Sequence, residues 1–82
     1  METNLLGYRK VNFTNNEGQT ILGTSLWLAW ALHGDEAKGY EAEKFFIADG
    51  GAVKLPVLEV DAEYIANFNS KGKLVSLIAK TN

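Results

Sequence analysis

The residues best suited to chemistry in this chain are aromatic residues that lie beside cations, in stretches whose side chains alternate between two sides as in a β-strand. Tyr8 lies on the same side of its stretch as Lys10, and Tyr40 on the same side as Lys44. A ring can stack on a nucleic-acid base while a neighbouring cation contacts phosphate, and single-strand binding needs both. The candidate nucleic-acid-binding residues are Tyr8, Arg9, Lys10, Trp27, Tyr40, Lys44, Tyr64, Lys71 and Lys73. If they act together, the cations Arg9, Lys10, Lys44 and Lys71 should converge on one groove.

The alternative interpretation places these rings in the hydrophobic core and the lysines on an ordinary solvated surface. Two Trp, three Tyr and four Phe residues fit within the single core of an 82-residue chain. Trp27 is the exception. If Trp30 points inward with Leu26 and Leu28, strand alternation turns Trp27 outward, where an indole indicates base stacking or a subunit interface. A non-catalytic protein–protein or self-association module is therefore the second functional hypothesis.

The other reactive side chains form no recognisable catalytic or metal-binding pattern. His33 is the single histidine and the chain has no cysteine, so no second soft ligand is present. Glu41 and Glu43 lie about 7 Å apart on one strand face, which is typical of an exposed rim rather than an acid–base pair. We therefore predict a protein that is not an enzyme, with no metal, no cofactor and no small-molecule substrate.

Five stretches alternate with the period of a β-strand. Gly23 lies within the longest, where a residue without Cβ permits a sharp bend or bulge. A helix is the competing interpretation there, but Gly23-Thr24-Ser25 is a poor helix interior. Polar, glycine-containing turns separate the first two stretches and the last two. The expected strands cover residues 7–14, 19–32, 40–48, 62–69 and 73–80.

These stretches predict an all-β fold in one domain that spans residues 1–82. A small, strongly bent, five-stranded barrel of the OB-like or SH3-like kind hides most strand edges and packs one core. Pro56 marks residues 52–58 as a connection, with one short helical turn expected near residues 52–56. A three-stranded sheet that carries one helix is the alternative.

Composition sets broad limits on partners and location. The net charge is −2, so the distribution of charge over the faces decides whether nucleic acid can bind. No stretch is long and apolar enough to span a bilayer, and no secretion signal is evident, so a cytoplasmic location without membrane contact is expected. A core of this size is marginal and would benefit from homodimer formation.

Several segments together resemble a known group of proteins. They are Tyr8-Arg9-Lys10-Val11-Asn12-Phe13, Glu17-Gly18, Gly23 to Trp30, Glu43 to Asp49, and Asn67 to Leu74. This pattern resembles small uncharacterised proteins of phages and conjugative elements of Gram-positive bacteria. Those proteins are in turn similar to the helix-destabilising proteins of filamentous phages. The resemblance implies a compact OB-like barrel that forms dimers and coats single-stranded DNA without strong sequence preference.

Overall fold

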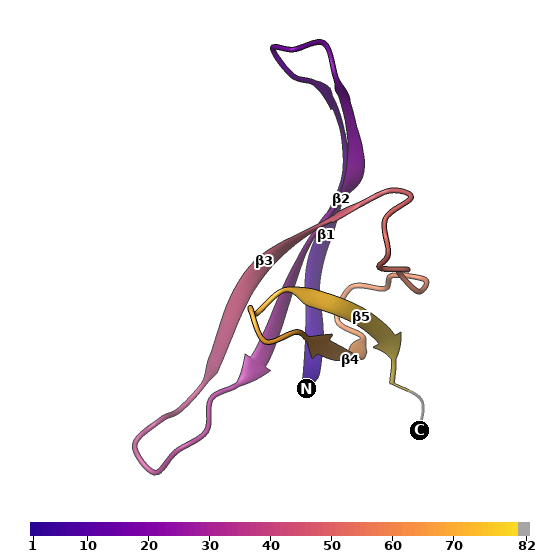
Figure 1. The fold of residues 1–82 in the computed structure, drawn as a ribbon. Coiled ribbons are helices and arrows are strands. Elements are labelled where there is room, and N and C mark those ends of the chain that lie inside the picture. The colour runs from indigo at the N-terminus through magenta and orange to yellow at the C-terminus, as the bar shows by residue number, and fades with distance from the viewer. Residues whose placement is uncertain (81–82) are drawn as a thin grey trace.

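The computed structural model describes residues 1–80, which form one sheet of five antiparallel strands (Figure 1). Its spatial order is β3-β2-β1-β4-β5. The strands are β1 (Glu2–Thr14), β2 (Thr20–Ala31), β3 (Tyr40–Ala48), β4 (Glu63–Phe68) and β5 (Leu74–Ala79). The predicted all-β fold and its five strands are confirmed. No helix that could cross a membrane occurs among these residues.

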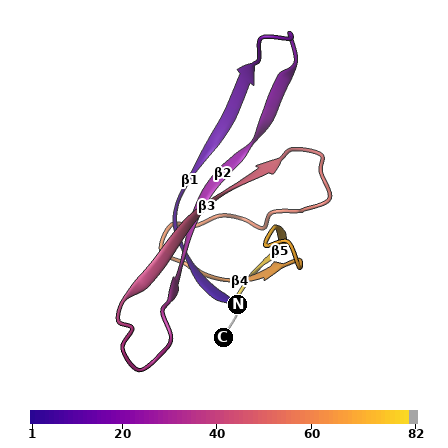
Figure 2. The same cartoon turned by 60° about the vertical axis from the view of Figure 1, so that its left-hand side comes forward.

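The sheet is not closed, so the predicted barrel is matched only loosely. β3 pairs with β2 alone and β5 pairs with β4 alone, which leaves an open seam between these two edge strands. The β1–β2 pair also continues beyond β3 as a two-stranded arm, residues 12–22, which projects from the body of the molecule (Figures 1 and 2). Within residues 1–80, no third strand pairs with this arm.

Gly23 has a different role from the expected bulge. The pairing of β2 with both neighbours runs regularly through Gly23, and the register shift lies in β1, between Leu5 and Gly7. A Cβ atom on Gly23 would lie 2.4 Å from Cζ of Phe46 and 2.6 Å from the carbonyl oxygen of Ile47. The missing side chain therefore makes room for the Phe46 ring and for the backbone of β3.

The core lies on one face of β1–β2–β3, where β4 and β5 fold back across it. Leu26 and Leu28 are fully buried there, and Trp30 packs against the same cluster. Trp27 lies on the opposite face, as alternation along β2 predicts. The buried cluster consists of Leu5, Leu26, Leu28, Ile47, Tyr64, Ala66, Leu74 and Leu77.

The connection from β3 to β4 contains no helix, so the helical turn predicted near residues 52–56 is wrong. Pro56 disfavours helical geometry at Leu55, the residue before it. The connection instead places Val53, Leu55 and Leu58 against the core. Burial of these side chains holds the segment against the sheet without regular structure.

The hydroxyl of buried Tyr64 anchors this connection. It accepts a hydrogen bond from the backbone N–H of Glu59 at 2.8 Å and donates one to the carbonyl of Val57 at 2.9 Å. We expect Tyr64→Phe to lower the free energy of unfolding by about 1–2 kcal/mol, because two backbone groups lose their partner. Urea denaturation measures this loss. Tyr40→Phe, at a residue that is 69% exposed, is the control and should change little; equal effects of the two substitutions would contradict the anchoring role.

Lys80 joins the ends of three strands at the surface. Its Nζ lies 3.1 Å from Glu2 and 3.2 Å from Glu63, and hydrogen bonds to these carboxylates raise the pKa of Lys80 above its usual value. The ion pairs of Lys80 therefore stabilise the folded state. This stabilisation is fully present below the pKa of lysine in the unfolded chain, about 10.5, and is lost as pH rises through the higher pKa of Lys80 in the folded state. The contribution is small because all three side chains are solvated.

Candidate nucleic-acid interface

A groove lies on the face of β1–β2–β3 that is turned away from the core. We call it the outer groove. It encloses about 440 Å³ and receives side chains from alternate positions of all three strands. Its lining consists of Arg9, Val11, Phe13, Ile21, Ser25, Trp27, Lys44 and Phe46.

Strand register explains why these residues meet. Ser25 pairs with Arg9 on one side and with Phe46 on the other, so the three form one row across the sheet. In the next row, Trp27 pairs with Lys44. Residues in adjacent rows of one face are close enough for long side chains to touch. Ser25 is small and buried, so it forms the floor of the groove between larger neighbours.

Trp27 and Lys44 form the closest ring–cation pair in this groove. The Nζ atom of Lys44 lies 5.6 Å from the centroid of the Trp27 ring, within the range of a cation–π interaction. The contact places a positive charge beside a half-buried indole. A base stacked on that indole would therefore have its phosphate within reach of a cation.

Two phenylalanines extend the aromatic surface around Trp27. The ring of Phe46 lies over the backbone at Gly23 and is 44% exposed. Phe13 reaches the groove from the arm and is 49% exposed. Both rings were missed as candidates, although alternation carried the signal. Phe13 shares its side of β1 with Arg9, and Phe46 shares its side of β3 with Lys44.

The outer groove is locally positive although the whole chain is negative. Arg9 and Lys44 are the ionisable residues in its lining, and no carboxylate of residues 1–80 lines it. Glu41 and Glu43 occur on the same strand as Lys44, but they pair with Trp30 and Leu28 and so belong to the other face. The alternation of β3 therefore separates its acidic and basic side chains.

The structure disperses the remaining candidates. Tyr8 and Lys10 share a face as predicted, but they pair with Leu26 and Thr24 and so lie on the core side of the sheet. Lys71 lies in the turn between β4 and β5. The predicted convergence of four cations on one groove is therefore wrong: Arg9 and Lys44 line the outer groove, whereas Lys10 and Lys71 lie elsewhere.

Three further candidates also lie outside the outer groove. Tyr40 shares its face but lines a separate hollow with Trp30 and His33. Lys73 lines a cleft beside β3. Tyr64 of β4 faces the core and is only 2% exposed, so a base cannot reach its ring. The prediction that Tyr64 stacks on a base is therefore wrong. Arg9, Trp27 and Lys44 are the candidates brought together.

No cluster of three or more histidine or acidic side chains that could hold a metal ion occurs within residues 1–80.

Comparison with protein-family profiles, curated proteins and solved structures finds no match to this chain. The functional argument therefore depends on the geometry of the outer groove.

Proposed function

We propose that this protein is a non-catalytic, single-stranded nucleic-acid-binding protein that acts through the outer groove. The observation that supports the proposal best is the convergence of Phe13, Trp27 and Phe46 with the cations Arg9 and Lys44 in one groove without a carboxylate. Base stacking needs accessible rings, and backbone contact needs cations beside them. The resemblance to phage and mobile-element proteins points to the same function.

In this proposal, bases stack on Trp27 and Phe46 while Arg9 and Lys44 contact the adjoining phosphates. Each stacked base contributes about 1–3 kcal/mol. Binding is insensitive to sequence because every base has a π-face, whereas sequence recognition depends on hydrogen bonds to base edges. Single strands are preferred over duplex, since bases in a duplex are already stacked on one another.

The protein is proposed to act as a homodimer, because two cations per groove provide limited affinity. Two grooves on one strand would raise the overall affinity through effective concentration. The arm offers a contact surface that leaves the groove open. Leu22 lies on its groove-distant face and is 46% exposed. A second copy would shield such apolar surface from water.

A fluorescence titration tests the proposal. A thymidine oligonucleotide should quench tryptophan emission at low salt, and a duplex of the same length should quench it much less. Two phosphate contacts per groove predict a slope of log K against log salt of about −1.4 when one groove is engaged, and of about −2.8 when both grooves of a dimer engage one strand. Absence of quenching at low salt would overturn the proposal.

Exposed apolar surface on the arm also favours the second function, a self-association module that binds no nucleic acid. Phe13 and Leu22 lie on opposite faces of the arm, and both are about half exposed. Sedimentation with and without the oligonucleotide separates the two functions. A stable dimer whose sedimentation does not change when DNA is added would favour this second function.

A further inference from the structure

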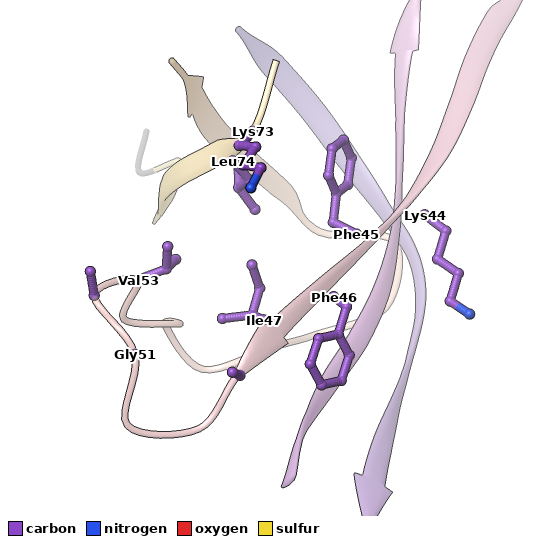
Figure 3. A pocket seen from close by; sticks show the side chains of 10 residues that line it. Lys44, Phe45, Phe46, Ile47, Gly51, Val53, Lys73 and Leu74 are labelled. Atoms are coloured by element: carbon purple, nitrogen blue, oxygen red, sulfur yellow. The ribbon is translucent and has the colours of Figure 1, made fainter. Parts of the chain in front are cut away.

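The open seam between β3 and β5 forms a second cleft, on the core side of β3 (Figure 3). Phe45 and Ile47 point into it from β3, and Leu74 faces them from β5. Val53 closes the cleft from the connection. Phe46 and Lys44 point to the opposite side of β3. We call this hollow the seam cleft. Its lining shares Lys44 and Phe46 with the outer groove, but the side chains of these two residues point away from the cleft (Figure 3).

The free edge of β3 borders the seam cleft with unpaired backbone groups. The N–H of Asp49 bonds to the carbonyl of Leu22, and the N–H of Leu32 bonds to that of Gly39. Antiparallel pairing alternates between bonded and non-bonded pairs. In this register, Glu43 and Phe45 direct their backbone groups toward β2, while Lys44 directs its own away from it. The backbone N–H and C=O groups of Ala42 and Phe46 also point away from β2.

These outward groups have no strand partner within residues 1–80, because β3 pairs with β2 alone. An edge that is nine residues long can accept an added strand. β5 does not satisfy these groups, because it pairs with β4 and forms no ladder with β3. A segment that binds here must therefore be extended, and its backbone must be free to form a ladder with β3.

The side chains of the cleft restrict the chemistry of that segment. Its apolar lining favours Val, Ile or Leu at alternate positions, which would face Phe45 and Ile47. The ionisable residues of the lining are Lys44 and Lys73, and no carboxylate within residues 1–80 lines it. Lys44 turns away, so Lys73 is the charge nearest to an occupant (Figure 3). Charge complementarity therefore favours an acidic side chain at that end.

We propose that the seam cleft binds an extended acidic–apolar peptide segment of a partner protein, which adds to the free edge of β3 as a further strand. Backbone hydrogen bonds to Lys44 and Phe46 hold the segment, alternate apolar side chains fill the cleft, and a carboxylate pairs with Lys73. This interaction differs from nucleic-acid binding, because it uses the backbone of Lys44 and Phe46 and the core side of β3, whereas nucleic acid would contact the side chains of these residues in the outer groove.

The test uses the intact protein and a synthetic peptide as long as β3, nine residues. Valine occupies the alternate positions that face the cleft, aspartate replaces the valine nearest Lys73, and threonine occupies the intervening positions, which face the other side. Amide hydrogen exchange followed by NMR is the main measurement. Saturating peptide should slow exchange at the outward N–H groups of Lys44 and Phe46. Exchange at Glu43 and Phe45 should not change, because β2 already satisfies their N–H groups. A peptide with lysine in place of aspartate should bind more weakly.

Charge reversal provides the matched pair of variants. Lys73→Glu should weaken binding of the aspartate-containing peptide about fivefold. Lys71→Glu makes the same charge change two residues away, outside the cleft lining, and should leave the affinity unchanged. Trp27→Ala should also leave peptide binding unchanged, so failure of this proposal and failure of nucleic-acid binding are distinguishable.

Several results would overturn the proposal. One is a peptide that does not bind the protein. Another is equal affinity of the Lys73→Glu and Lys71→Glu variants for the peptide. A third is a peptide N-methylated at every second residue that binds as tightly as the unmethylated peptide. Protection at Lys44 and Phe46 that rises with protein concentration in the absence of peptide would assign the edge to a second copy of this chain instead.

Discussion

Trp27→Ala is expected to weaken the binding of a single-stranded oligonucleotide about 5- to 150-fold. The loss of one stacked base removes about 1–3 kcal/mol, and about 1.4 kcal/mol corresponds to a factor of ten. Lys44 also loses the ring that positions its ammonium group. Fluorescence anisotropy of a labelled thymidine oligonucleotide measures the change without relying on the missing indole. Trp27→Phe retains an aromatic face, so its affinity for the oligonucleotide should lie between those of the wild type and Trp27→Ala.

Tyr40→Ala is the control for this prediction. Tyr40 is an exposed ring on the same face of the sheet, but it lies outside the outer groove. Its removal should change affinity less than twofold, which is about 0.4 kcal/mol. Urea denaturation should confirm that Trp27→Ala remains folded, since Trp27 lies opposite the core. Equal affinities of a folded Trp27→Ala protein and the wild type would remove the groove as the binding site.

Gly23→Ala is expected to lower the free energy of unfolding by about 1–3 kcal/mol. The new Cβ atom would lie 2.4 Å from the ring of Phe46 and 2.6 Å from the carbonyl oxygen of Ile47. The ring can rotate away, but the carbonyl belongs to the backbone of β3 and moves only with the strand. A change of this size lowers Tm by about 4–8 °C per kcal/mol in a domain of this length. Urea denaturation measures it directly.

Gly7→Ala provides the matched control, because Gly7 is also a strand glycine and a Cβ atom there would meet nothing within 4 Å. It should leave stability unchanged or raise it by several tenths of a kcal/mol. Phe46→Ala combined with Gly23→Ala should recover part of the loss, since one of the two clashes disappears. Equal stability of Gly23→Ala and Gly7→Ala would show that the contact between Gly23 and β3 carries no strain.

The amino-acid sequence was sufficient to predict the strands, because alternation is a local property. The third strand was predicted with its observed bounds, Tyr40–Ala48, and the others within one residue at most ends. Alternation also placed Trp27 and Trp30 on opposite faces of β2, since successive side chains of a strand point to opposite sides. The outstanding miss among the bounds is the start of β1. Its first residues pair with β4, about 60 positions away, and no local pattern indicates such a partner.

Features that depend on distant segments appear only in the folded chain. Alternation could not reveal that β3 and β5 do not pair with each other, because the closure of a sheet depends on the relative placement of its two edge strands. Alternation also could not predict that Tyr64 is buried beneath the connection, or that Arg9 and Lys44 meet across β2. Both features depend on strand order and register. Local chemistry therefore determined which residues form strands and which face each side chain takes. Long-range pairing determined which faces meet, and hence which rings and cations share a groove.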